Sequence, residues 1–237
     1  MDKVVFNTVP ELVDEMVNQL TELIHTTVAS RRRFSMALTG GSAARQLYPH
    51  LPVRDIPWKQ VLLFFGDERV VPATHPDSNY LLAKQLLLDR VGIPPENVYR
   101  IPTESDDPQA MEMLYTNKLT RALGPRPALD LIHLGMGGDG HVCSLFAGHP
   151  AFEEKHKSVV FVADAPKPPP DRVSLSMVSL LRAQDIWIQV TGPDKAEAVR
   201  ECLENPDSEL PAAVLARLHP SVTFILDRDA AHLLSDV

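Results

Sequence analysis

The sequence is short of cysteine and of long apolar runs. It holds only two cysteines in 237 residues, Cys143 and Cys202, which is too few for a disulfide framework. We therefore expect free thiols in a reducing cytosol. No apolar run is long enough to cross a bilayer, and residues 1–10 lack the basic segment and apolar core of a secretory signal peptide. The sequence thus predicts a cytoplasmic protein with no membrane partner.

Positive charge is also scarce, because 23 Lys and Arg face 31 Asp and Glu and the formal net charge is −8. This balance argues against wrapping a nucleic acid. A small anionic substrate stays open, since a few local basic residues can outweigh a weak overall field. The length suits one large α/β domain or two small ones. No segment reads as a convincing linker, and we interpret the proline-rich stretch 166–170 as a surface loop, so we predict a single domain across residues 1–237.

Strand-like and helix-like segments alternate along the chain. Helical spacing of apolar residues predicts helices at 10–29, 43–48, 78–90, 108–123 and 195–203. Compact apolar runs predict strands at 3–6, 34–38, 61–65, 129–134, 158–162, 172–176, 186–190 and 222–226. This order predicts an α/β fold with a mostly parallel sheet and helices on both faces. Ligands of such sheets bind at the carboxyl ends of the strands, where the clusters described next are placed.

The first cluster, Gly40–Gly41–Ser42, joins a predicted strand to a predicted helix. Glycines let the backbone approach a ligand closely, and the free N–H groups of a helix start suit a phosphate. The same residues also fit a tight turn in which Ser42 caps the helix. They nearly match the nucleophile elbow of serine hydrolases, but they lie too early in the chain for that fold, so serine catalysis is the minor option.

The second cluster, Asp67–Glu68–Arg69, follows a buried strand. The planar guanidinium of Arg69 matches a phosphate, and the carboxylates of Asp67 and Glu68 could orient Arg69, hold sugar hydroxyls or act as acid or base. On this triplet alone, a solvated charged loop is the simpler interpretation. Arg172 and Lys195, further along, are open to the same two readings: a phosphate partner or a surface charge.

The third cluster is the glycine-rich stretch 135–141. Its glycines match a dinucleotide-binding pattern, but that pattern opens the first strand–helix unit and needs an acidic residue ending the next strand. Here Glu153–Glu154 precede the next strand. We therefore interpret the glycines, Gly137 among them, as shaping a loop around a ligand that presents Asp139 and His141. An aspartate beside a histidine sets its tautomer, and histidine is the natural general base near neutral pH.

A metal site is conceivable only at the residues His133, His141, Cys143 and His149, which lie close together in the sequence. Their spacing matches no standard zinc pattern, and His133 lies within an apolar strand. We predict no metal.

Together these segments resemble the 6-phosphogluconolactonase family. The stretches GDERVVP at 66–72, SNY at 78–80 and GMGGDGHVCSLFAGHP at 135–150 are highly specific. LTGGS at 38–42, RVSLS at 172–176 and TGPDK at 191–195 support them. The matching pieces occur in family order and cover most of the chain.

The resemblance implies a three-layer Rossmann-like fold and hydrolysis of 6-phospho-D-glucono-1,5-lactone in the oxidative pentose phosphate pathway. No cofactor is needed, because a lactone is already activated toward water. His141, oriented by Asp139, would activate that water, and Asp67 and Glu68 would position the substrate or Arg69. The phosphate would be held by a set of backbone amides, one hydroxyl and basic side chains: Gly40, Gly41, Ser42, Arg69, Arg172 and Lys195.

Two alternatives share the expected fold. Amino-sugar-phosphate deaminases show a pattern like D-G-H-x-x-F-N-E, whose glutamate completes a relay through the histidine, whereas Phe146 occupies that position here. Non-catalytic sugar-phosphate sensors are usually joined to a DNA-binding helix-turn-helix, which is not evident in this sequence. The oligomeric state is open, with a monomer favoured.

Overall fold

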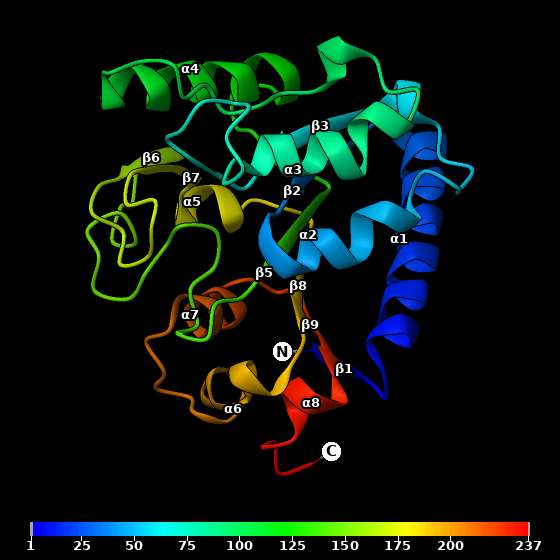
Figure 1. Ribbon diagram of the computed structural model, residues 1–237, viewed down its shortest axis with the longest axis vertical. Helices are drawn as coiled ribbons and strands as arrows, with labels where there is room; N and C mark the ends of the chain where they lie inside the picture. Colours follow the sequence, from blue (N-terminus) through cyan, green and yellow to red (C-terminus); the bar gives the residue numbers. More distant parts are fainter. Residues whose placement is uncertain (1, 237) are drawn as a thin grey trace.

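A parallel sheet forms the centre of the protein. The computed structural model describes residues 2–236, and within them the sheet has six strands in the order β1-β9-β8-β5-β2-β3 (Figure 1). Every pairing in it is parallel. The strands are β1 (Asp2–Phe6), β2 (Phe34–Leu38), β3 (Val61–Phe65), β5 (Leu131–Gly135), β8 (Asp185–Val190) and β9 (Val222–Asp227). This arrangement confirms the predicted α/β class.

Both faces of the central sheet are covered. All five residues of β2 and all five of β3 are buried, and successive side chains of a strand point to opposite faces. These strands therefore need packing partners on each side, which explains their nearly continuous apolar sequence. The longest helix, α1 (Val9–Arg31), packs against β1, β2 and β9. The hydroxyl of Thr8 caps its start by accepting a hydrogen bond from the Glu11 N–H.

The other helices lie mostly where the apolar spacing places them. The predicted helix at 78–90 ends at Leu86 and continues as a short 3₁₀ turn, and the helix at 211–218 was not predicted. The remaining helices are α2 (Gly41–Leu47), α3 (Asn79–Leu86), α4 (Pro108–Leu123), α5 (Met177–Leu180), α6 (Ala196–Glu204), α7 (Pro211–Leu218) and α8 (Arg228–Ala231).

A second, antiparallel sheet stands beside the first and was not expected. It consists of β4 (Asp67–Arg69), β7 (Arg172–Leu175) and β6 (Val159–Val162), in that order. Gly66 connects the two sheets, since its N–H donates to the Leu38 carbonyl and its own carbonyl accepts from the Leu175 N–H. Figure 1 shows β6 and β7 on one side of the molecule and α1 on the other.

The small sheet corrects the interpretation of the charged triplet. Asp67, Glu68 and Arg69 form a strand and not a solvated loop, and the two acidic residues are only 6% and 3% exposed. The two strands around the proline-rich stretch, β6 and β7, pair with one another, and β7 also pairs with this triplet, so β4 enters the core against β7. One connected apolar cluster reaches from Leu12 to Leu234. Across residues 2–236 no helix has the length and apolar character that a membrane span requires.

Candidate active site

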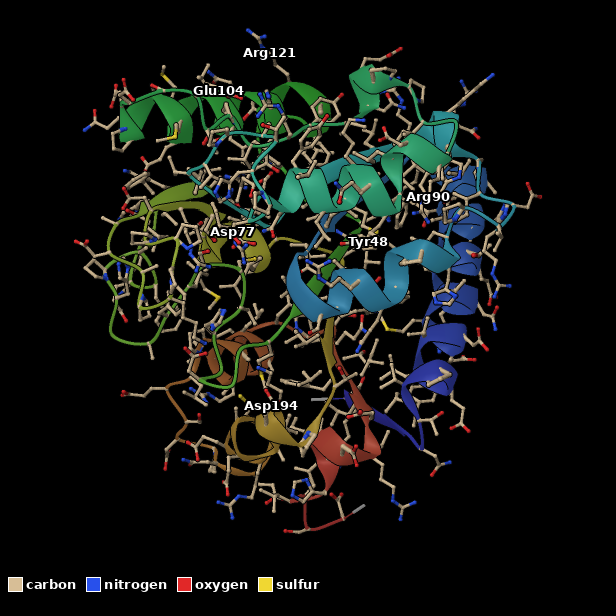
Figure 2. The ribbon with its side chains drawn as sticks, viewed as in Figure 1. Tyr48, Asp77, Arg90, Glu104, Arg121 and Asp194 are labelled. Carbon is tan, nitrogen blue, oxygen red and sulfur yellow. The ribbon has the colours of Figure 1, made fainter. Side chains whose placement is uncertain are left out.

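A polar cavity of about 200 Å³ opens at the carboxyl ends of β2, β3 and β5. It gathers residues from segments far apart in the sequence. Two labelled residues in Figure 2 help to locate it: the Asp77 carbonyl accepts from Arg69, and Asp194 pairs with Lys195. Most predicted site residues line it: Gly40, Gly41, Ser42, Asp67, Arg69, Gly137, His141, Arg172 and Lys195.

His141 and Asp139 form a close pair in the loop after β5. The Nδ1 atom of His141 lies 2.5 Å from Asp139 Oδ1, and the histidine side chain is 17% exposed. Burial lowers the pKa of His141 below its ordinary value of 6.5, against the opposing effect of Asp139. Burial raises the pKa of Asp139, but its bonds to His141 and Lys167 outweigh that effect and bring it down to about 2. At neutral pH the pair is therefore a carboxylate and an uncharged imidazole.

The surroundings of the His141 ring explain two residues of the motif. A Cβ on Gly137 would lie 2.1 Å from His141 Nδ1 and 2.4 Å from Asp139 Oδ1, so glycine is required here for close approach. On the other side, the Phe146 ring centroid is 4.5 Å from that of His141. Phe146 is buried, and it occupies the position where the deaminase pattern has its glutamate. An apolar ring therefore stands where a relay carboxylate would be needed.

Asp67 is fixed in the cavity wall by uncharged partners. The Ser144 hydroxyl donates to Asp67 Oδ2 over 2.6 Å, and the Asn79 side-chain amide donates to Oδ1 over 3.1 Å. Asn79 also packs against the first glycine turn, because a Cβ on Gly40 would lie 1.9 Å from Asn79 Oδ1. The turn after β2, the strand β4 and the start of α3 thus form one connected wall.

Glu68 has a different position from the one we predicted. It does not line the cavity. Its carboxylate accepts hydrogen bonds from the backbone N–H groups of Arg69, Asn79 and Tyr80 and from the Ser78 hydroxyl, at 2.7–3.0 Å. Burial raises its pKa, and these bonds oppose the rise. The geometry therefore makes Glu68 a clamp between β4 and the start of α3, rather than an acid or base that touches a substrate.

Cationic side chains line the cavity from several directions. Arg172 is 3% exposed, and its guanidinium donates to the carbonyls of Pro169 and Lys167 and to the Ser144 hydroxyl. Burial lowers the pKa of Arg172, which indicates a cation that an anionic ligand would stabilise. Arg69 and Lys195 enter from β4 and from the turn after β8. This concentration of positive charge suits a phosphate group.

The turn at Gly40–Ser42 differs in detail from the expectation. Helix α2 begins at Gly41, with Gly40 at the N-cap position and no side-chain cap. Ser42 therefore lies in the first turn and does not cap the helix. Among residues 2–236 no hydrogen bond connects Ser42 to a histidine, which gives the serine-nucleophile reading no support.

Sequence reasoning missed Lys167 and Asn79. Lys167 lines the cavity from the proline-rich stretch that we interpreted as an ordinary surface loop, and its Nζ lies 3.0 Å from Asp139 Oδ2. The available signal was a lysine between two prolines, because a proline restricts the backbone of the residue before it and so favours a defined loop conformation. Asn79 belongs to the family-like SNY stretch, but the sequence alone did not assign it a contact.

The residues considered for a metal are dispersed. His133 is fully buried in β5 and its Nε2 is 2.9 Å from Gln189 Oε1, whereas His149 Nε2 is 2.8 Å from the Ala163 carbonyl. Within the described part of the chain, no three His, Cys, Asp or Glu side chains are grouped as metal ligands. Cys143 lines the cavity as a thiol, since burial raises its pKa well above the ordinary value.

The glycine-rich stretch also lacks the context of a dinucleotide site. Between Gly135 and β6 the described chain consists of turns and bends without a helix. A dinucleotide fingerprint requires a helix to start there and receive the pyrophosphate.

Comparisons with known proteins agree with this geometry. The model of the glucosamine-6-phosphate isomerases/6-phosphogluconolactonase family matches residues 7–224. The 6-phosphogluconolactonase of Rattus norvegicus is 38% identical over 93% of this chain and 90% of its own length. The solved 6-phosphogluconolactonase from Trypanosoma cruzi superposes with a TM-score of 0.89 at 28% identity, covering 99% of this chain and 97% of the other.

A solved monomeric glucosamine-6-phosphate deaminase shares the fold, with a TM-score of 0.82 at 23% identity over 98% of this chain and all of the other. This confirms the expected common fold of lactonases and deaminases. The match of the family model over most of the chain and the identity to the rat enzyme lead to one conclusion: the chain belongs to the glucosamine-6-phosphate isomerase/6-phosphogluconolactonase family.

Proposed function

We propose that this protein hydrolyses 6-phospho-D-glucono-1,5-lactone to 6-phospho-D-gluconate in the oxidative pentose phosphate pathway. The observation that carries the proposal is the placement of His141, whose Nδ1 lies 2.5 Å from Asp139, in the same cavity as Arg69, Arg172 and Lys195. The same cavity can therefore activate water at His141 and neutralise a phosphate with its cationic side chains. The rat and trypanosome relatives are named for this lactonase activity.

The phosphate group of the substrate binds to the cationic side chains that line the cavity. Arg69 donates to the exposed backbone carbonyl of Asp77, and Lys195 pairs with the exposed carboxylate of Asp194. A phosphate dianion can therefore compete for the N–H groups of both side chains. Arg172 bonds only to uncharged groups. The turn at Gly40–Ser42 adds backbone N–H groups and one hydroxyl to the same wall. Glu68 contributes indirectly, by holding the segment that carries Arg69 and Asn79.

The reaction uses His141 as a general base. Its Nδ1–H donates to Asp139, which leaves the Nε2 lone pair free to take a proton from water. The water oxygen forms a bond to the lactone carbonyl carbon, giving a tetrahedral intermediate. When that intermediate collapses, the bond from the same carbon to the ring oxygen breaks, and His141 returns its proton to that oxygen. The products are a carboxylic acid, which ionises, and a free hydroxyl, with no redox change.

The amino-sugar-phosphate deaminase is the alternative enzyme. Its relay needs a carboxylate beside the histidine, and Phe146 fills that place at 4.5 Å between ring centroids. The protein should therefore release no ammonia from glucosamine 6-phosphate. Three further predictions accompany the proposal: a single domain, which the connected core supports, a cytosolic location, and a monomeric state.

The decisive experiment follows loss of freshly made 6-phosphogluconolactone, or the accompanying proton release, with and without protein. The spontaneous hydrolysis must be subtracted. We expect catalysed turnover of the lactone and no ammonia from glucosamine 6-phosphate in a parallel assay. Binding of the lactone without turnover would instead identify a sugar-phosphate sensor, and ammonia release would identify a deaminase.

A further inference from the structure

Lys167 occupies a position that the reaction described above does not use. It lies in the loop between β6 and β7, and that loop is fastened by Arg172, whose guanidinium donates to the carbonyls of Lys167 and Pro169 at 2.8 and 3.0 Å. The loop closes on itself, because the Ala165 N–H donates to the Pro170 carbonyl. The buried guanidinium of Arg172 thus fixes the backbone of Lys167. The side chain of Lys167 lines the cavity.

The Lys167 ammonium contacts the outer oxygen of Asp139. Its Nζ lies 3.0 Å from Asp139 Oδ2, while Oδ1 of the same carboxylate receives His141. In the described chain, no other side chain bonds to Oδ2. The Asp139 side chain is 42% exposed, so without Lys167 that oxygen would face solvent and the orientation of the carboxylate would depend on its bond to His141. Lys167 therefore fixes the plane of the group that orients His141.

The same ammonium also lies near the imidazole. Its Nζ is 3.5 Å from His141 Nδ1, but Nδ1 directs its proton at Asp139 and cannot accept a second one, so the effect of Lys167 on the ring is electrostatic. Asp139 by itself favours the charged imidazolium, and a neighbouring ammonium opposes that charge. Lys167 therefore offsets part of the rise in the His141 pKa that Asp139 causes.

We propose that Lys167 is a positioning residue for the Asp139–His141 pair: its ammonium holds the outer oxygen of the carboxylate that orients the histidine, and it opposes a positive charge on the imidazole. This inference rests on the proposed function, since it assigns a task to the general base of that reaction. Charged groups on other elements also lie near His141, and they include both an anion, which favours a charged imidazole, and cations, which oppose it. They are Asp67 from β4, Arg172 from β7 across the Phe146 ring, and Lys195 from the turn after β8.

The test compares Lys167→Met with Lys167→Arg and with a control, Lys157→Met. Met keeps the length of the side chain without its charge, and Arg restores a cation. Lys157 is a surface lysine paired with Glu112, away from the cavity. For each variant, lactone turnover is measured against pH, and the His141 ring is titrated by NMR in the free protein. The titration does not depend on turnover, so it reports on Lys167 even if the proposed function is wrong.

In Lys167→Met we expect the His141 titration to move up by about half a pH unit to one unit. The acid limb of kcat/KM should move with it, so activity falls several-fold at mildly acidic pH and much less at alkaline pH. Lys167→Arg and Lys157→Met should keep the wild-type midpoints. An unmoved His141 titration in a folded Lys167→Met protein would overturn the proposal. So would a loss of activity that is equal at every pH, because it would indicate that Lys167 contacts the substrate instead.

Discussion

At the scale of single residues, the uncharged His141 is the feature on which the mechanism depends. The His141→Asn variant should keep its fold and its phosphate binding, yet lose about 10²–10⁴-fold in turnover, because the general base is gone. The wild-type kcat/KM should fall as pH drops through the His141 pKa. That midpoint should lie below the ordinary value of 6.5, since burial lowers it. Turnover against pH for the wild type and the variant checks both statements.

Background hydrolysis of the lactone also changes with pH, so the variant must be measured over the same range and subtracted in the same way. A folded, substrate-binding His141→Asn protein with near-normal turnover would move the base elsewhere. Asp67 would then be the next candidate, because its carboxylate lines the cavity.

Gly137 gives a second prediction at this scale. A methyl group there would lie 2.1 Å from His141 Nδ1, well inside contact distance, so Gly137→Ala must displace the histidine or its aspartate. We expect a loss of turnover of about 10²-fold with little change in the denaturation midpoint, since the loop lies at the surface of the cavity. Gly92→Ala is the control, because Gly92 lies outside the cavity and a methyl group there would meet no atom within 4 Å. Equal activities of the two variants would contradict the close-packing argument.

At the scale of elements, the pairing of β5 with β8 places a buried histidine in the core. His133 bonds to Gln189 across this pair, and burial lowers its pKa from 6.5 to about 4. The unfolded chain binds a proton near pH 6.5, whereas the folded protein resists it down to about pH 4. The contribution of His133 is thus fully present above pH 6.5 and is lost as pH falls toward 4.

Each unit of pKa difference corresponds to about 1.4 kcal/mol, so this loss amounts to about 3 kcal/mol of unfolding free energy. Urea denaturation of the wild type and of His133→Gln across this pH range measures it. The stability of the variant should depend less steeply on pH than that of the wild type. Parallel curves would show that His133 does not titrate differently in the folded and unfolded states.

The sequence predicted the central elements better than the small sheet. Strands such as β2 and β3 are recognisable because burial on both faces leaves an unbroken apolar run. The three residues of β4 carry charges and gain their strand conformation from pairing with β7, about a hundred residues away. No local pattern encodes that partner. Helix α7 was missed for a related reason: it is short, and its packing against α6 decides its conformation.

The site residues divide in the same way into those that the sequence could predict and those that it could not. The histidine, its aspartate and Arg69 could be found from residue type after the ends of β5 and β3, because parallel strands bring their carboxyl ends to one edge. The sequence could not reveal that Glu68 points away from the cavity or that Lys167 enters it. Both outcomes depend on how the small sheet and its loop pack against the large one.

At the scale of the whole molecule, a cationic cavity is set in a chain with a net charge of −8. Such a site should select its substrate through the phosphate and not through the sugar ring alone. We expect 6-phosphogluconolactone to be strongly preferred over unphosphorylated gluconolactone. Arg69→Ala should reduce use of the phosphorylated lactone by about 2–5 kcal/mol in kcat/KM. Steady-state kinetics on both lactones measure this preference. Similar turnover of the two lactones by the wild type would contradict the proposed phosphate site.

The strand order also determines when the central sheet can close during synthesis. Strand β9 is made after the other five strands of the central sheet, and it lies between β8 and β1. A nascent chain still missing residues 222–227 leaves β1 without a neighbour and β8 as an open edge, while the strands that carry the glycine turn, the charged triplet and the histidine loop already have their partners. The central sheet therefore cannot close until residues 222–227 have left the ribosome, and until then an unpaired β8 edge is a site where nascent chains can aggregate.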